Sequence, residues 1–139
     1  MIPRRYVPDY LTQEDKEKAK KNIEESREAY KKGKYIERIK LKSAKSKKSN
    51  WTTQFKNKYG DLNKSEIVKL LESKGAINAN DAIDEILKKG KGAFYSSGSR
   101  PLQTAFSWAW ARLYSVLLGG NSREIDKDIV NKYNIPLLG

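Results

Sequence analysis

The chain is 139 residues long, carries 29 Lys and Arg against 17 Asp and Glu, and contains neither Cys nor His. The lack of Cys and His excludes disulfides, thiol catalysis, zinc fingers and histidine-based acid–base or metal chemistry. A formal net charge of +12 exceeds what solubility requires and indicates a nucleic acid, an anionic surface or an acidic protein as partner.

Residues 1–11 predict an extended leader, because they hold two prolines, together with tyrosines that can anchor the segment in a groove. The charges near this terminus also predict that no secretory signal peptide is present. A helix is then expected from Thr12, a residue type that caps helices, to about Lys32, with Gly33 as its end. Its apolar face is narrow, so this helix needs a packing partner to be stable.

Positive charge is concentrated in residues 31–48, where nine Lys and Arg face a single acid, Glu37. Apolar residues interrupt these charges, which predicts that part of the segment is extended and docked. Residues 43–49 are expected to form a solvated basic loop. The segment either contacts phosphates, which makes binding strongly dependent on salt, or is a solvated arm with no specific partner. Both interpretations are open at this point.

Two short helices are predicted after this basic segment. Aromatic residues at every fourth position predict the first helix over residues 51–59. The second is expected to begin at residues 63–66, NKSE, which are a variant of the capping box, and to end at Gly75.

A third short helix is predicted over residues 81–89, with Gly90 as its stop. Two short helices joined by a tight turn resemble a helix-turn-helix DNA-binding module. The second of the two helices carries Asp81, Asp84 and Glu85, which repel phosphate, so plain helical packing is the favoured interpretation.

The densest apolar run lies in residues 90–120. A turn is expected at residues 96–101, SSGSRP, and the apolar spacing after it predicts a helix from about Gln103 to Leu118. We expect its two tryptophans to serve packing and not base stacking. Arg112 interrupts this helix, which is also too short to span a bilayer.

The SSGSRP turn has two interpretations. Serine hydroxyls, Arg100 and the N–H groups of a beginning helix suit a phosphate or carboxylate. Alternatively the serines satisfy the turn and the helix end, and Arg100 pairs with an internal acid, which is the commoner use of such residues. The candidate nucleic-acid or anion-binding residues of the whole chain are Lys40, Lys42, Lys45, Lys47, Lys48, Ser97, Ser99 and Arg100.

The C-terminal part predicts one more helix. Asn121 or Ser122 is expected to cap it, and it should reach about Tyr133. Residues 135–139 form a short apolar tail that needs a groove on this chain or on a neighbour. The elements together predict a mostly α fold: a small helical domain of five to six short helices over residues 51–139, preceded by a leader, a helix and an extended basic N-terminal arm over residues 1–50.

The stretch KGKGAFYSSGSRPLQTAFSWAWARLYSVLLGG, followed by REIDKDIV, resembles a small basic protein family of large DNA viruses that infect algae and other protists. The family pattern is approximately a GAYYSSGSRPNQT start, a helix with SW and ARL, and a GG turn. The front half, RRYVPDYLTQEDK and SREAYKKGKYIERIKLKSAKSKKS, also resembles it. This chain departs from the pattern at Leu102, where the family has asparagine, and at Phe106.

The resemblance implies a viral protein made in infected cells, which is either a virion component or a protein that handles viral nucleic acid. We expect a minor capsid or capsid-associated protein that docks onto other virion proteins through its arms. The alternative is a non-sequence-specific nucleic-acid-binding protein of the virus, with DNA as its partner. The implied location is the virion, and the host cytoplasm or viral factory during assembly.

An enzyme is not expected. Without His or Cys, a serine nucleophile such as Ser97 or Ser99 would need a lysine base, which is rare. We likewise expect no cofactor, no metal and no membrane span.

Overall fold

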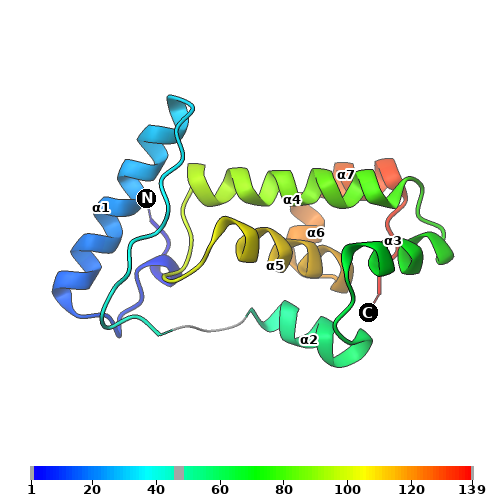
Figure 1. The fold of residues 1–139 in the computed structure, drawn as a ribbon, viewed down its shortest axis with the longest axis horizontal. Coiled ribbons are helices and arrows are strands. Elements are labelled where there is room, and N and C mark those ends of the chain that lie inside the picture. Colours follow the sequence, from blue (N-terminus) through cyan, green and yellow to red (C-terminus); the bar gives the residue numbers. More distant parts are fainter. Residues whose placement is uncertain (1, 46–48, 139) are drawn as a thin grey trace. The chain divides into compact units, whose positions relative to one another are not determined.

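The computed structural model describes residues 2–45 and 49–138, which are mostly helical and contain no strand (Figure 1). The predicted fold class, a mostly α protein with an extended basic arm, is confirmed. Seven α-helices and one short 3-10 helix lie within the described residues, because one predicted helix is broken in two and the short leader contains a helical turn. The elements are η1 (Arg4–Tyr6), α1 (Gln13–Lys31), α2 (Asn50–Tyr59), α3 (Lys64–Ser73), α4 (Ala79–Ser96), α5 (Ala105–Leu118), α6 (Asn121–Ile125) and α7 (Lys127–Tyr133).

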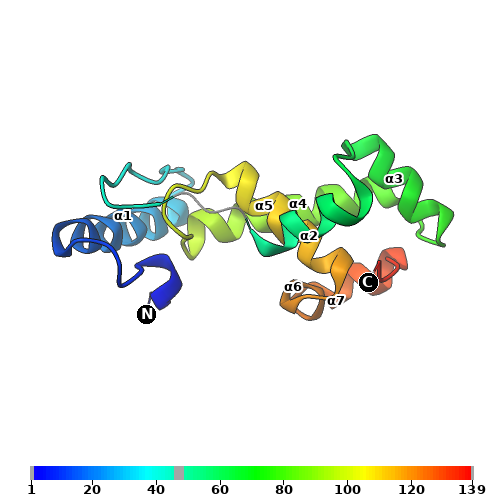
Figure 2. The same ribbon diagram turned by 90° about the horizontal axis from the view of Figure 1, so that it is seen from below.

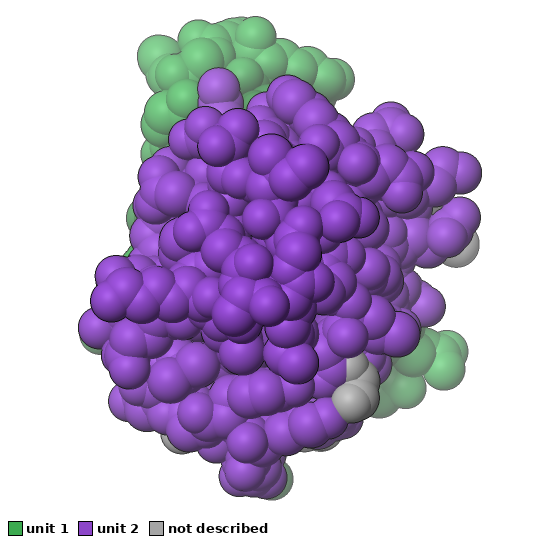
Figure 3. Space-filling view, turned by 90° about the vertical axis from the view of Figure 1, so that its right-hand side faces the viewer, with its two compact units in different colours: residues 1–47, 91–108 green, residues 48–90, 109–139 purple. Residues whose placement is uncertain are grey.

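The chain divides into two compact units, each formed from two separate stretches of sequence (Figure 3). Unit 1 comprises residues 1–47 and 91–108, and unit 2 comprises residues 48–90 and 109–139. Unit 1 thus combines the leader, α1 and the basic arm with residues 91–108, which run from the last part of α4 to the start of α5. The predicted division at residue 50 stays a prediction.

Unit 1 has a small apolar core. The leader contributes to it, since Tyr6 and Val7 are buried and the Tyr6 ring meets the Trp108 ring edge-on at 5.7 Å between centroids. Leu41 of the basic arm is buried in the same cluster. The narrow apolar face of α1, with Ala19 and Ile23, therefore finds its packing partners within its own unit.

Unit 2 has the larger core. It gathers one face of each of α2 and α3, the first part of α4, the later part of α5, and α7. The C-terminal tail belongs to it, because Ile135 and Leu138 are buried there. The Leu138 N–H donates to the carbonyl of Leu117, at 2.8 Å, and the Tyr59 hydroxyl donates to the Leu138 carbonyl, at 2.9 Å. The groove that the tail was expected to need lies on this chain.

Two helix starts match the capping residues that the sequence indicated. Thr12 caps α1, where its side chain accepts a hydrogen bond from the Asp15 N–H. Asn63 and Glu66 form a complete capping box on α3, in which each side chain accepts from the backbone N–H of the other residue. Such reciprocal bonds satisfy N–H groups that no helical carbonyl reaches.

Gly90 does not end a helix, and the prediction of a stop there is wrong. Residues 79–96 form one continuous helix, α4, with Gly90 and Gly92 inside it. A side chain at Gly90 would place its Cβ 2.8 Å from the Cα of Ala109 on α5. Gly90 is therefore required by close helix packing in unit 2 and not by the end of a helix.

Helix α4 ends instead near Gly98. Gly98 has φ of +126°, a conformation that favours glycine. The N–H groups of Ser97 and Gly98 both donate to the carbonyl of Ala93, at 2.9 and 3.3 Å. The dipeptide Phe94–Tyr95 therefore lies in the last turn of α4, and Phe94 is fully buried.

The helix predicted over residues 121–133 is broken at Asp126 into α6 and α7. The expected caps are also wrong, since the N-cap residue is Gly120, which has no side chain to cap the helix, and the Ser122 N–H donates instead to the Ser115 hydroxyl, at 3.4 Å. The reason for the break is an ion network in the interior of unit 2. The Asp126 side chain is fully buried and accepts hydrogen bonds from Arg112 Nε and Nη2, at 2.9 and 2.8 Å, and from Lys89 Nζ, at 3.1 Å.

This network lowers the pKa of Asp126. Burial by itself raises the pKa of the carboxyl group, but the hydrogen bonds and charges of Arg112 and Lys89 outweigh burial. Because the pKa is lower in the folded than in the unfolded state, the stabilisation is present above the ordinary value near ~4 and is lost as the pH falls through the folded-state value.

Replacement of the buried carboxylate, Asp126→Asn, should therefore destabilise the protein by about 3 kcal/mol at neutral pH, because two cations lose their counter-charge. Urea unfolding measured from neutral to acidic pH should show the wild-type and variant curves converging as the pH falls. The exposed Asp128→Asn variant is the control and should change stability by less than about 1 kcal/mol. Parallel curves for wild type and Asp126→Asn would contradict the role of the network.

Candidate nucleic-acid interface

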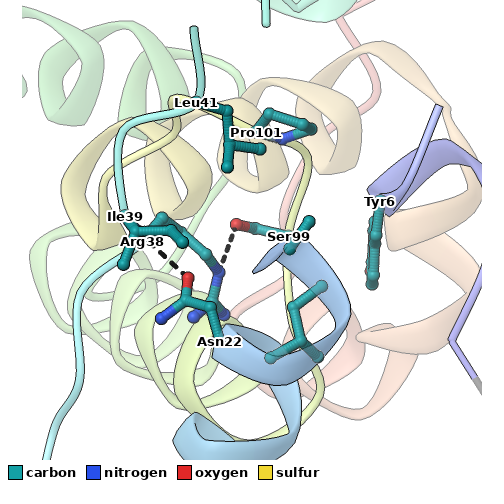
Figure 4. Close-up of a pocket in the computed structure, with 9 residues that line it drawn as sticks. Tyr6, Asn22, Arg38, Ile39, Leu41, Ser99 and Pro101 are labelled. Carbon is teal, nitrogen blue, oxygen red and sulfur yellow. Dashed lines mark hydrogen bonds between the residues drawn. The ribbon is translucent and has the colours of Figure 1, made fainter. Parts of the chain in front are cut away.

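The basic arm, defined as residues 31–45, runs back along α1 (Figure 1, Figure 2). Asn22 on α1 fixes its backbone with two hydrogen bonds. The Asn22 side-chain amide donates to the Glu37 carbonyl, at 3.1 Å, and its oxygen accepts from the Ile39 N–H, also at 3.1 Å (Figure 4). Asn22 is buried, so these bonds satisfy a polar side chain that water does not reach.

A second anchor lies near the start of α1. The buried Asp15 carboxylate accepts hydrogen bonds from the Ser43 N–H, at 2.8 Å, and from the Ser43 hydroxyl. These two bonds lower the pKa of Asp15 from its ordinary value. Ser43 also accepts from the Thr12 N–H, at 3.1 Å. The loop predicted over residues 43–49 is therefore attached to α1 at its first residue, and residues 46–48 lie outside the described part of the chain.

Arg38 is the one arginine of the arm, and its side chain points inward. Its Nε donates to the Ser99 hydroxyl, at 2.9 Å (Figure 4). Its Nη2 donates to the Phe94 carbonyl, and its guanidinium lies 4.3 Å from the centre of the Phe94 ring. Burial lowers the pKa of Arg38, although an arginine stays charged at neutral pH. The arm is thus joined to residues 94–99 by a partly buried cation.

Helix α4 explains why cations gather at this place. Two more backbone carbonyls at this end accept hydrogen bonds from α1. The Tyr95 carbonyl accepts from the Ser26 hydroxyl, at 2.9 Å, and the Ser97 carbonyl, just after α4, accepts from Arg27 Nε, at 2.8 Å. The last carbonyls of a helix have no helical partner and carry partial negative charge, so they favour cations. Arg27 and Arg38 supply that charge.

The SSGSRP turn therefore belongs to the end of α4 and not to the start of α5. Its first residue, Ser96, is the last residue of α4, whereas α5 begins only at Ala105. Ser99 is buried, and its hydroxyl accepts from Arg38 and donates to the Arg100 carbonyl, at 3.0 Å. Ser97 and Arg100 are exposed. The first turn of α5 is capped by its own residues, because Thr104 and Ser107 exchange side-chain to backbone bonds of 3.0 Å. Anion binding by this turn stays a prediction.

Leu102, in the turn before α5, has φ of +61°, in the left-handed region that asparagine enters more readily than leucine.

Three candidate lysines lie on the outer side of the arm. Lys40, Lys42 and Lys45 are exposed, and none of them forms an ion pair with a described residue. Lys40 and Lys42 flank the buried Leu41, and Lys45 follows a turn in which the Ala44 N–H donates to the Leu41 carbonyl, at 3.1 Å. Lys47 and Lys48 lie outside the described residues.

Two positions that hold the arm carry no signal in the sequence. Arg38 is one of nine basic residues in a single run, and Asn22 lies among charged residues on the helix predicted from Thr12. Neither spacing nor residue type distinguishes them. Only the position of the last turn of α4 selects Arg38 as the inward-pointing cation.

The distribution of charge distinguishes the two units. The stretches of unit 1 hold 17 Lys and Arg against 8 Asp and Glu, whereas those of unit 2 hold 12 against 9. The excess positive charge of the chain therefore lies mainly in unit 1. A field of one sign over a surface raises the local concentration of polyanions.

The cavity beside Arg38 does not provide a second kind of site. It measures about 10 Å³, which is room for about one water molecule and not for a phosphate. Among residues 2–45 and 49–138, no group of three acidic side chains lies close enough to hold a metal ion. No helix in the same part of the chain is long and apolar enough to cross a membrane.

The fold and the surface define a small, basic, mostly helical protein. The chain belongs to a family of unknown function (DUF5824), whose model matches residues 3–132. No curated protein and no solved structure matches the chain. The viral origin that the sequence motif implies stays a prediction.

The role of Arg38 can be tested by replacement with a side chain of similar length, Arg38→Met. We expect a loss of about 2–4 kcal/mol of stability, because two buried acceptors lose a charged donor. The arm should also become more sensitive to trypsin at Lys40, Lys42 and Lys45. Urea unfolding and limited proteolysis provide the two measurements.

The matched control is Lys40→Met on the outer side of the same arm. It should change stability by no more than about 0.5 kcal/mol, since Lys40 is exposed and unpaired. Equal stability of Arg38→Met and Lys40→Met would show that the arm is held by other contacts.

Proposed function

We propose that this protein binds nucleic acid without sequence specificity, through the lysines of the basic arm. One observation carries the proposal. Five lysines of an arm attached to α1 are exposed and form no ion pair with a described residue: Lys32, Lys34, Lys40, Lys42 and Lys45.

The features of the arm fit nucleic-acid binding better than they fit docking onto a neighbouring protein. Its apolar residue Leu41 is buried within unit 1, and Asn22 bonds the Glu37 carbonyl and the Ile39 N–H of its backbone, so the arm is held without a second protein. What it leaves exposed is mainly charge. Lysine is a flexible point charge that suits phosphate oxygens and reads no base sequence.

Attachment of the arm matters for affinity. A free basic tail loses conformational entropy when it binds, whereas an arm held by Asn22, Asp15 and Arg38 has already lost most of it. The proposed activity is binding alone, and it needs neither a cofactor nor a metal. Arg100, which is also exposed in unit 1, is a further phosphate contact in this proposal.

The test is a triple variant, Lys40→Gln, Lys42→Gln and Lys45→Gln. Each lost phosphate contact should lower the slope of log affinity against log salt by about 0.9 for duplex DNA, so the slope should fall by up to about 2.7. Affinity at low salt should fall about tenfold or more. Fluorescence anisotropy with labelled DNA at several salt concentrations measures both quantities.

The matched control replaces three exposed lysines of unit 2, Lys69, Lys74 and Lys88, with glutamine. It removes the same charge from the chain but should leave the salt slope nearly unchanged. If both triple variants lower affinity equally, net charge and not the arm governs binding. If the wild type shows no salt-dependent binding at all, the proposal fails.

A second candidate function is that of a minor capsid or capsid-associated protein. The family resemblance supports it, and so do three large apolar side chains of unit 2 that are more than half exposed: Ile77 at 58%, Ile125 at 62% and Leu137 at 59%. Residues of this kind favour contact with other virion proteins.

Purified virus particles separate the two candidates. A capsid-associated protein should stay with the shell after the genome is digested by nuclease and washed away at high salt. A protein that binds only nucleic acid should leave with the genome. Protein mass spectrometry of the two fractions provides the measurement, and absence from both fractions would contradict the virion role.

A further inference from the structure

Three tyrosines of unit 1 form a contiguous aromatic surface beside the arm. The rings of Tyr30 and Tyr35 lie 6.1 Å apart between centroids, and those of Tyr35 and Tyr95 lie 4.9 Å apart. Tyr35 is 66% exposed and Tyr30 is 37% exposed. Large aromatic side chains usually bury most of their area, so two exposed tyrosines in contact are a distinct surface feature.

The surface is built by the turn that follows α1. Gly33 has φ of +77°, which reverses the chain, and the Lys34 N–H donates to the Ala29 carbonyl, at 2.9 Å. This turn brings Tyr35 back over Tyr30 at the end of the helix. Tyr35 is therefore presented by a defined turn and not by a loose tail.

Tyr95, in the last turn of α4, supports the other side. Its hydroxyl donates to the Glu37 carboxylate, at 2.6 Å. Burial, followed by this hydrogen bond and the charge of Glu37, raises the pKa of Tyr95 to about 12, so the ring stays uncharged at neutral pH. Glu37 is the single acid of residues 31–48, and this hydrogen bond engages it.

Lysines are adjacent to the aromatic surface in the chain. Lys32 and Lys34 flank the Gly33 turn, are exposed, and form no ion pair with a described residue. Lys31 is exposed as well but pairs with Glu28, at 3.2 Å. Exposed rings and unpaired ammonium groups thus occur within a few residues of each other.

We propose that Tyr30, Tyr35 and Tyr95, with Lys32 and Lys34, form a site for single-stranded nucleic acid, on whose Tyr35 ring an unpaired base stacks. The site rests on the proposed function and names its substrate class. Stacking needs a free base face, which single strands offer along their length and a duplex offers only at its ends. Lysines beside the ring contact the phosphates of the same strand.

The chemistry favours this ligand over an acidic protein. Carboxylate side chains would pair with the lysines but would leave the exposed rings in water. A nucleotide uses both features at once, since every base has a π-face and every linkage carries a charge. The same reasoning predicts little dependence on base sequence, because stacking is tolerant of base identity.

The experiment compares Tyr35→Leu, Tyr35→Phe and wild-type protein. Each is titrated against a labelled oligothymidylate of about 20 nucleotides and against a duplex of the same length. Tyr35→Leu should bind the single strand about 5- to 100-fold more weakly and bind the duplex as the wild type does. Tyr35→Phe keeps the ring and should bind both as the wild type does. The salt slope for the single strand should be the same in all three proteins, since no charge is changed.

Controls separate this inference from the function on which it rests. Ile77→Ala removes an exposed apolar side chain of unit 2 and should leave both affinities unchanged. Thermal melts check that Tyr35→Leu is folded, which we expect from the exposure of the residue. If Tyr35→Leu binds both probes as the wild type does, or weakens both equally, the stacking site is wrong while nucleic-acid binding stands. If the wild type binds the duplex but not the single strand, only the stacking site is wrong, and if it binds neither probe, both proposals fail.

Discussion

The contact of Arg38 with the C-terminal end of α4 is the interaction on which unit 1 depends. A helix end that is left without partners exposes carbonyl groups, and burying those groups unpaired costs free energy. The guanidinium of Arg38 reaches the Phe94 carbonyl, covers the Phe94 ring and engages Ser99. A single side chain therefore satisfies the helix end, packs against the core and holds the basic arm.

The same run of positive residues serves two physical purposes. One cation, Arg38, is partly buried, because helix carbonyls favour it there, and the lysines of the arm are exposed, because an unpaired ammonium group is too costly to bury. The contacts of Arg38, Leu41 and Asn22 fix which side of the arm faces the rest of unit 1 and leave the lysines in solvent. The outer side of the arm thereby becomes a charged surface of fixed geometry, and the Gly33 turn adds Tyr35 to it. Both proposals about nucleic acid follow from this division.

Local signals predicted the helix starts well, since Thr12 and Asn63 act through residues three positions away. They failed at Gly90 and Asp126, where the reason lies elsewhere in the chain. Gly90 looked like a stop because glycine commonly ends helices, but a neighbouring backbone at Ala109 requires it. Asp126 lies inside the single helix expected to reach Tyr133, but in the structure it is buried and pairs with Arg112 and Lys89. Long-range contacts of this kind leave no periodic trace in the sequence.

By itself the sequence determined the mostly α class, the excess of positive charge and its concentration in residues 31–48, because propensity, capping and charge are properties of neighbouring residues. Tertiary structure alone decided which basic residue of the arm is partly buried, which serines are engaged and which tyrosines are exposed. Those outcomes depend on the end of α4 meeting α1 and the arm, which are 56 to 70 residues away in the chain, as in the bond from Ser26 to Tyr95. A buried polar group must find its partner in space, and distance along the chain does not specify that partner.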